Sequence, residues 1–365
     1  MTALTGCSNR RASGSPRQAV GDVLWPAAGG LRLALVVGAF CVAWLAVLGC
    51  GARRASVEAA NTSGGAVVRG GHGPVAAGEI YAVDALGVEV RLASPARRVV
   101  SLAPNLTEIV CLVGGEGQLV GVTDFCKYPP QVRSKPKVGG VINPSLERVL
   151  ALRPDLLLVA RGTDLRIIER MRKSGVPVYA ADPKSVREVI GLVRAVGHLL
   201  GRDAEADAAA RKLEARLAAL TSKQPARGRR PKALAVVELE PLFVAGSGSF
   251  LDDLLRLAGL ENAARGEQPW ARWSSERVLN ADPDLILVVC AHGALGGADS
   301  GLRDRLMARA PWRTLRAVKA GDVYSVTDDF VTIPGPRLLD GLEQVVSIRR
   351  AYERGLVARG AAAPG

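Results

Sequence analysis

The chain has 365 residues, of which 48% are hydrophobic, so it can bury more than one hydrophobic core. Its 48 basic and 35 acidic residues give a formal net charge of +13, which makes nucleic acid, anionic lipid and an anionic ligand candidate partners. The basic residues are scattered and aromatic residues make up 4% of the chain, so there is no stacking platform of the kind that single-strand binders use, which argues against nucleic acid.

The first fifty residues have the layout of an export signal. An uninterrupted apolar run, residues 33–49, follows four arginines and ends in the tetrapeptide Val-Leu-Gly-Cys. This tetrapeptide resembles a bacterial lipobox and makes Cys50 the predicted lipidation site. An uncleaved membrane anchor is the alternative, although the run is slightly shorter than the ~20 apolar residues that span a bilayer. We therefore predict a lipoprotein signal peptide over residues 1–50 and a flexible tether, rich in Gly, Ala and Ser, over residues 51–77.

The folded region begins near residue 80, where short apolar runs start to alternate with amphipathic helical patterns. Two alternating runs around Asp84-Ala-Leu-Gly87 predict a β-hairpin. Residues 98–103 predict a buried strand, Pro104 opens a helix, and residues 119–123 predict the next strand. This alternation is typical of βαβ units with parallel strands.

An internal repeat is the clearest sign of organisation. Residues 144–160 (PSLERVLALRPDLLLVA) and residues 273–289 (WSSERVLNADPDLILVV) match at ten of seventeen positions. Each copy predicts the same unit: Ser145 or Ser274 caps a short helix, a proline ends it, and an apolar run forms a core strand. Two copies without further repetition predict two similar lobes rather than a solenoid.

Between the two copies the sequence predicts two helices. Ser185-Val-Arg-Glu188 is a capping box that starts the first helix, and the second starts at Asp203 and runs for about 20 residues, or roughly 30 Å. We predict an α/β fold of two Rossmann-like lobes with mainly parallel sheets, joined by a single long helix, with the ligand cleft between the lobes. A helical crossing makes a stiff hinge, so we expect little lobe closure. The N-terminal lobe, linking helices and C-terminal lobe are placed at residues 78–183, 184–229 and 230–365.

The motifs argue against an enzyme. The chain has no Gly-x-Ser-x-Gly elbow, no phosphate-binding loop of the Gly-x-x-x-x-Gly-Lys type, no His-Glu-x-x-His and three histidines in all. We assign no catalytic residue, no metal site and no resident cofactor. His292 follows an apolar strand and could face the cleft as a metal ligand, but a single histidine in a loop is more often incidental.

Several motifs together carry a family resemblance. In chain order they are RVVSLAPNLTEIV, LVGVTDFCKYPP, PKVGG, the two repeat copies and GDVYSV. Their order and spacing over residues 80–350 resemble the helical-backbone metal-receptor family, the class III periplasmic binding proteins for vitamin B12, ferric siderophores and haem. The vitamin B12 branch is the most similar.

The resemblance implies a non-enzymatic function. It implies a substrate-binding lipoprotein that captures a corrinoid such as cobalamin and delivers it to an ABC permease, a two-fold symmetric transmembrane dimer with ATPase subunits. The protein would be exported and lipid-anchored, on the periplasmic or cell-surface side of the membrane. A ferric siderophore or haem is the alternative ligand within the family, and a membrane-tethered sensor module is the alternative outside it.

The family carries one glutamate on the rim of each lobe, which pairs with arginines of the permease. These glutamates fall on Glu147 and Glu276, at equivalent positions of the repeat. Two matching carboxylates suit a two-fold symmetric partner. The alternative role is local, because a carboxylate in the first turn of a helix complements the helix dipole.

The ligand site is expected between the lobes, at the carboxyl ends of the strands, where open α/β sheets bind their ligands. The few aromatic residues concentrate in the loops at these ends, and flat aromatic faces suit a corrin or porphyrin ring. An arginine there could meet a phosphate, amide or carboxylate. For the two phenylalanines, packing at the lobe junction is the alternative. The predicted ligand-binding residues are Pro104, Asn105, Tyr128, Arg161, Phe243, Trp270 and Phe330.

Three cysteines lie in the folded region, so they cannot all pair with one another. Cys111 lies on a predicted helix and Cys126 in the loop after it, which is compatible with a local disulfide in an oxidising compartment. Cys290 follows the apolar run LILVV and is predicted to be a buried free thiol.

Overall fold

The computed structural model describes residues 80–160, 162–222, 229–290, 302–327 and 331–358. All of these belong to one compact unit, Gly71–Gly365. The predicted signal peptide, tether and lipidation site at Cys50 lie outside the described residues, as do Arg161, His292, Phe330 and the side chain of Cys290. In the described ranges, no helix combines the length and apolar character that a membrane span requires.

The predicted hairpin is confirmed. Strand β1 (Ile80–Val83) pairs antiparallel with β2 (Glu89–Leu92). Asp84 accepts hydrogen bonds from the backbone N–H groups of Leu86 and Val88, each at 2.9 Å, and so closes the turn. Gly87 has a φ of +74° there, a conformation that costs glycine no side-chain clash.

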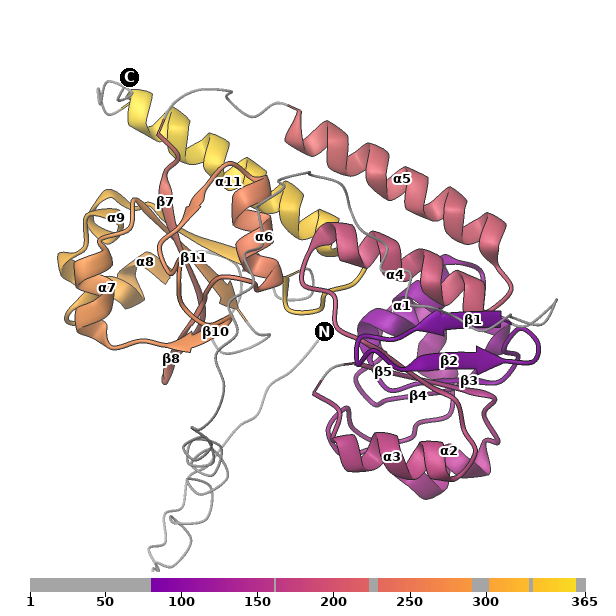
Figure 1. The fold of residues 1–365 in the computed structure, drawn as a ribbon. Helices are drawn as coiled ribbons and strands as arrows, with labels where there is room; N and C mark the ends of the chain where they lie inside the picture. Colours follow the sequence, from indigo (N-terminus) through magenta and orange to yellow (C-terminus); the bar gives the residue numbers. More distant parts are fainter. Residues whose placement is uncertain (1–79, 161, 223–228, 291–301, 328–330, 359–365) are drawn as a thin grey trace, which may run out of the picture. The chain divides into compact units, whose positions relative to one another are not determined.

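The N-terminal lobe, on the right of Figure 1, is built on four parallel strands, whose order is β4-β3-β5-β6. Successive residues of the central strand face opposite sides, as the pleat requires. Leu156 and Leu158 pack with α1 and α4, whereas Leu157 and Val159 pack with α2 and α3. The elements of this lobe are β3 (Val99–Ser101), α1 (Pro104–Leu112), β4 (Leu119–Val122), α2 (Leu146–Ala151), β5 (Leu156–Ala160), α3 (Leu165–Lys173) and β6 (Val178–Ala181), with 3₁₀ turns at Glu116–Gln118 and Pro130–Ser134.

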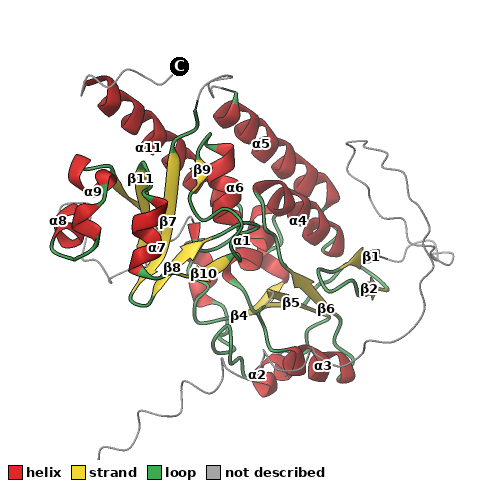
Figure 2. Cartoon of the chain, turned by 60° about the vertical axis from the view of Figure 1, so that its left-hand side comes forward, coloured by secondary structure: helices red, strands yellow, loops and turns green. Residues whose placement is uncertain are grey.

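The C-terminal lobe has a mixed sheet in the order β10-β8-β7-β11-β12, with β9 beside β7. Helices α6 and α11 pack on one face, and α7, α8 and α9 on the other (Figure 2). Each buried leucine in these layers contributes roughly 1.5–3 kcal/mol to folding. The elements are β7 (Lys232–Leu239), β8 (Leu242–Ala245), α6 (Phe250–Leu257), β9 (Glu261–Asn262), β10 (Trp270–Arg272), α7 (Ser275–Ala281), β11 (Leu285–Cys290), α8 (Leu302–Met307), α9 (Arg316–Ala320), β12 (Val323–Thr327) and α11 (Leu338–Ala358), with a 3₁₀ turn at Trp312–Thr314.

One strand of this sheet, β8, runs antiparallel to its neighbours. Strands β7, β9, β11 and β12 pair in parallel with one another, as predicted, whereas β8 pairs antiparallel with both β7 and β10. The reason is local. Glu240 and Pro241 alone separate β7 from β8, and so short a connection can only join antiparallel strands.

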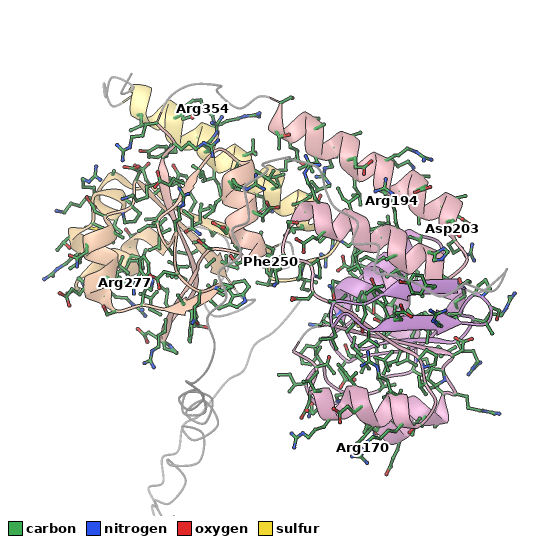
Figure 3. All side chains as sticks on the ribbon, in the orientation of Figure 1. Arg170, Arg194, Asp203, Phe250, Arg277 and Arg354 are labelled. Atoms are coloured by element: carbon green, nitrogen blue, oxygen red, sulfur yellow. The ribbon has the colours of Figure 1, made fainter. Side chains whose placement is uncertain are left out.

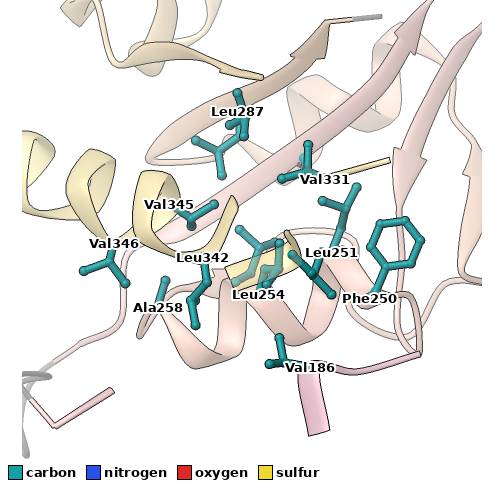
Figure 4. Close-up of a cluster of buried hydrophobic side chains, with 14 of the residues drawn as sticks. Val186, Phe250, Leu251, Leu254, Ala258, Leu287, Val331, Leu342, Val345 and Val346 are labelled. Atoms are coloured by element: carbon teal, nitrogen blue, oxygen red, sulfur yellow. The ribbon is translucent and has the colours of Figure 1, made fainter. Parts of the chain in front are cut away.

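Two helices connect the sheets, α4 (Val186–Leu199) and α5 (Asp203–Thr221). The predicted capping box is present, because Ser185 accepts a hydrogen bond from the N–H of Glu188 at 3.1 Å and the Glu188 carboxylate accepts one from the N–H of Lys184 at 2.9 Å. Helix α4 belongs to both cores. Its first half, including Val186, packs against α6 and α11 (Figure 4), and its second half packs into the N-terminal core. A helix buried at both ends supports the predicted stiff connection.

The two copies of the repeat fold alike, as predicted. Ser145 and Ser274 each accept a hydrogen bond from a backbone N–H three residues later, at 3.3 Å in both copies. The helices α2 and α7 follow these caps, and the parallel core strands β5 and β11 follow the helices. The repeat therefore places one equivalent helix and strand in each lobe.

Candidate functional site

A cavity of about 610 Å³ lies between the two lobes. On the N-terminal side it adjoins the carboxyl ends of β3, β5 and β6, which is where the sequence predicts the cleft. On the C-terminal side it adjoins the start of α6 and the segment that leads into β10. The lining residues are Asn105, Ala160, Gly162, Ala181, Asp182, Pro183, Lys184, Gly248, Ser249, Phe250, Gln268, Pro269, Trp270 and Pro334.

Two aromatic side chains form one wall of this cavity. Trp270 lies at the start of β10 and is 45% exposed, which is high for a large apolar ring. Phe250 is buried at the start of α6, where Figure 3 labels it. The two rings meet edge to face, with centroids 5.3 Å apart and an interplanar angle of 60°. Phe250 therefore supports the Trp270 ring and leaves part of it free to contact a ligand.

The backbone around these rings is tightly held. A Cβ atom at Gly246 would lie 2.1 Å from the carbonyl oxygen of Gln268, so only glycine lets these two segments approach so closely. The Ser249 hydroxyl donates to the Gly246 carbonyl at 2.8 Å and accepts from the N–H of Asp252 at 3.1 Å, which caps α6. These contacts bring Phe250 and Trp270 to the same wall.

The polar groups of the lining are mostly neutral. Asn105, in the first turn of α1, donates from Nδ2 to the carbonyl oxygen of Pro334 at 3.2 Å and so joins the two sides of the cavity. Gln268 and Ser249 add an amide and a hydroxyl. Among the described lining residues, the charges are those of Lys184 and Asp182, whose side chains lie 3.6 Å apart. This lining can hydrogen-bond a large ligand but carries almost no net charge.

Of the predicted ligand-binding residues, Asn105 and Trp270 line the cavity. Pro104 begins α1 beside Asn105 but is not part of the lining. Tyr128 is also outside it, and the guanidinium of Arg337 lies over its ring, 4.4 Å from the centroid. Phe243 lies within β8, where it pairs with Arg272 of β10 and Glu238 of β7, and it too is outside the lining. The cavity therefore extends from Asn105 and Trp270 toward α6, and a ligand-binding role for Pro104, Tyr128 and Phe243 stays a prediction.

Sequence reasoning missed several lining residues, above all Phe250, Gln268 and Lys184. Phe250 begins a helix, whereas the aromatic contacts are predicted in loops at the ends of strands. Its signal was the pair Ser249 and Asp252, a helix cap directly after a glycine-rich turn. Nothing in the sequence marks Lys184 or Gln268 as a ligand contact apart from position: Lys184 precedes the capping box at Ser185, and Gln268 lies two residues before Trp270.

The two predicted docking residues occupy equivalent places in the lobes. Glu147 lies in the first turn of α2 and Glu276 in the first turn of α7, and both are exposed. Neither carboxylate makes a hydrogen bond or ion pair with another described side chain. Arg277, which follows Glu276 and is labelled in Figure 3, pairs instead with Glu267. Both glutamates are therefore available to a partner.

The predicted disulfide is wrong, because both thiols are free in the structure. Cys126 is buried, with its sulfur 3.1 Å from the hydroxyl of Thr107 and 3.2 Å from that of Thr123. Burial and the nearby carboxylate of Glu116 raise the pKa of the Cys111 thiol to about 11.

Comparison with known proteins gives the family. The family described as "Periplasmic binding protein" matches residues 99–330. The chain belongs to this family.

Individual relatives agree with this result. An uncharacterized ABC transporter substrate-binding lipoprotein of Bacillus subtilis, YvrC, is 27% identical over 72% of this chain and 82% of its own length. The crystal structure of the periplasmic vitamin B12 binding protein BtuF of Vibrio cholerae is similar with a TM-score of 0.63 and 26% identity, over 71% of this chain and 99% of that one. The periplasmic haem-binding protein RhuT of Roseiflexus sp. RS-1 has a TM-score of 0.61 and 25% identity, over 71% and 99%. The chain is thus a substrate-binding protein of the ABC-transporter type and not an enzyme.

Proposed function

We propose that this protein captures a corrinoid of the vitamin B12 type between its two lobes and delivers it to an ABC permease. The observation that supports this most directly is the cavity wall formed by Trp270 and Phe250, which offers a partly exposed aromatic face to a flat macrocycle. The amide groups of Asn105 and Gln268 suit the neutral amide groups around a corrin ring. The vitamin B12 binding proteins among the relatives support the same ligand class.

The protein would be anchored to the membrane by a lipid on Cys50 and would work on its outer side. The apolar run that ends at Cys50 and the substrate-binding lipoprotein of Bacillus subtilis support this part of the proposal. Growth of cells with radiolabelled palmitate would label the wild-type chain and not the Cys50→Ser variant. A labelled Cys50→Ser chain would contradict the assignment.

Haem is a second candidate ligand. Lys184 in the lining could pair with a carboxylate of the porphyrin, and a haem-binding protein is among the similar structures. Asp182, 3.6 Å from Lys184, weakens this candidate because it already offsets the positive charge.

Isothermal titration calorimetry of the full-length chain in detergent tests the proposal. The titrants are cyanocobalamin, haemin and a panel of ferric siderophores. We expect one-to-one binding of cyanocobalamin with a submicromolar Kd. Binding of haemin or a siderophore alone would keep the transport function and replace the ligand. No binding of any of them would favour a tethered sensor module.

A further inference from the structure

The two copies of the repeat expose the same pair of side chains. Leu150 on α2 is 38% exposed and Leu279 on α7 is 36% exposed. Each leucine follows the exposed glutamate of its helix, Glu147 or Glu276, by three residues, so carboxylate and leucine are neighbours on one helix surface. The match is notable because large apolar side chains gain nothing from exposure to water.

Both helices are fixed to their sheets by the same internal contact. The residue just before each leucine, Val149 or Val278, is buried, with 0% and 1% of its surface exposed. It packs beneath the helix in the core of its lobe. The exposed carboxylate and leucine are therefore held in a defined position, which lowers the entropy cost of binding a partner.

The ends of the two helices are also held alike. In the N-terminal lobe, Nε of Arg98 donates to the carbonyl oxygen of Leu152 at 3.2 Å. In the C-terminal lobe, Nζ of Lys232 donates to the equivalent carbonyl, that of Ala281, at 3.4 Å. A cation beside the last carbonyl groups stabilises a helix end. The two lobes thus resemble each other both in sequence and in the contacts that hold the ends of α2 and α7.

We infer that each lobe docks through a carboxylate and a leucine together, Glu147 with Leu150 and Glu276 with Leu279. The inference rests on the proposed function, and the partner is the permease dimer. A two-fold symmetric partner presents the same site twice, which explains why this chain carries the same pair twice. Each permease subunit would offer a cationic group for the glutamate and an apolar pocket for the leucine. The leucine excludes water from the ion pair and strengthens it.

The test measures binding of the full-length chain to the cognate permease–ATPase complex in nanodiscs by biolayer interferometry. Leu150→Gln and Leu279→Gln keep the helices polar and soluble while removing the apolar contact. We expect each to raise Kd about fivefold and the double variant to raise it about twenty-five-fold, since distant sites add. The affinity for cyanocobalamin and the Tm should not change.

A matched control removes one exposed apolar side chain from each lobe elsewhere. Leu165 on α3 is 60% exposed and Met307 on α8 is 36% exposed. The double variant Leu165→Gln/Met307→Gln should bind the complex as the wild type does. An equal loss in this control would show a general effect of surface polarity and overturn the inference.

Variants of the two glutamates distinguish a failure of this inference from a failure of the proposed function. If Glu147→Gln/Glu276→Gln binds weakly while Leu150→Gln/Leu279→Gln binds normally, the leucines have no docking role and the proposed function stands. If both double variants bind normally, the proposed docking surface itself is wrong. A loss with one leucine variant alone would contradict two equivalent contacts, and self-association lost in the leucine variants would identify a second copy of this chain as the partner.

Discussion

Arg337, the residue before α11, forms a two-point ion pair with Glu108 on α1. Its Nη2 lies 2.6 Å from Oε1 and its Nε 3.0 Å from Oε2. Both side chains are largely buried, with 16% of Arg337 and 4% of Glu108 exposed. Glu108 follows the cavity residue Asn105 by three residues on the same helix, so the pair connects the two lobes directly behind the cavity.

Breaking this ion pair should destabilise the protein. Arg337→Met leaves the Glu108 carboxylate buried without its cation, which should lower the free energy of unfolding by about 3–5 kcal/mol. The double variant Glu108→Met/Arg337→Met should recover most of this loss, because it removes both charges of the pair. Urea unfolding followed by circular dichroism measures both.

The exposed pair of Arg166 and Asp164 supplies the control for this measurement. The side chain of Arg166 is 87% exposed, so Arg166→Met should leave the unfolding curve unchanged. An Arg337→Met protein as stable as the wild type would show that the buried pair does not hold the lobes together.

Trp270 should contribute strongly to ligand affinity. Trp270→Ala removes the exposed ring from the cavity wall and should raise the Kd for cyanocobalamin by at least about tenfold, because stacking and burial of a large ring are lost. Phe125 is a matched control, since it is 59% exposed and does not line the cavity. Titration calorimetry of Phe125→Ala should give the wild-type Kd. Equal affinity of the Trp270→Ala protein would move the ligand site away from this wall.

The glutamates of the repeat, Glu147 and Glu276, should be required for uptake of the ligand but not for binding it. Glu147→Arg/Glu276→Arg should abolish uptake of radiolabelled cyanocobalamin by cells, because each lobe would then repel the cationic groups of the permease. Cyanocobalamin binding by the purified chain should stay unchanged. Glu169→Arg/Glu261→Arg reverses one exposed carboxylate on each lobe elsewhere and should leave uptake intact. Normal uptake by the first variant would remove the docking assignment.

The architecture could be predicted because its signals are local and repeated. Ser185 and Glu188 mark the start of α4 in the sequence, and the structure shows both capping hydrogen bonds. The repeat gave two equivalent helix–strand units because ten matching positions encode the same cap and the same buried strand. The antiparallel strand β8 followed from two intervening residues that were not recognised as a hairpin turn.

The site was harder to predict because its members come together only in the folded chain. Phe250 and Trp270 are too far apart in the sequence for a local pattern to predict that their rings meet. Their contact depends on the close approach of Gly246 to Gln268. Glu108 reads as an ordinary residue on an amphipathic helix, and nothing in the sequence pairs it with Arg337. The sequence also gives no sign that the guanidinium of Arg337 lies over the ring of Tyr128, whose role in ligand binding stays a prediction. Each of these contacts joins residues that are distant in the sequence, so only the folded structure shows it.

The Cys111 thiol should react slowly below pH 9 and should form no disulfide with Cys126. Its pKa is raised to about 11, so the reactive thiolate is scarce at pH 8 and its alkylation by iodoacetamide should still increase between pH 9 and 11. Mass mapping of this peptide reports the rate. Without reductant, Cys111→Ser should unfold at the wild-type urea concentration. A disulfide closing this loop would instead make the wild type more stable by about 3 kcal/mol.

Asp155 and Asp284, equivalent residues of the repeat, should differ in their contribution to stability. Each accepts a hydrogen bond at 2.8 Å from a backbone N–H at the start of the neighbouring strand, that of Arg98 or Lys232. The side chain of Asp284 is 7% exposed and also binds Arg229 at 3.0 Å, whereas Asp155 is exposed to solvent.

Removal of the two carboxylates therefore has different consequences. Asp284→Ala leaves the partly buried backbone N–H of Lys232 without its acceptor and should cost about 2–3 kcal/mol. After Asp155→Ala, water can replace the carboxylate, so the cost should be at most about 1 kcal/mol. Urea unfolding of the two variants gives the comparison. If both variants lose the same free energy of unfolding, then the hydrogen bond itself, and not its burial, determines how much Asp155 and Asp284 stabilise the protein.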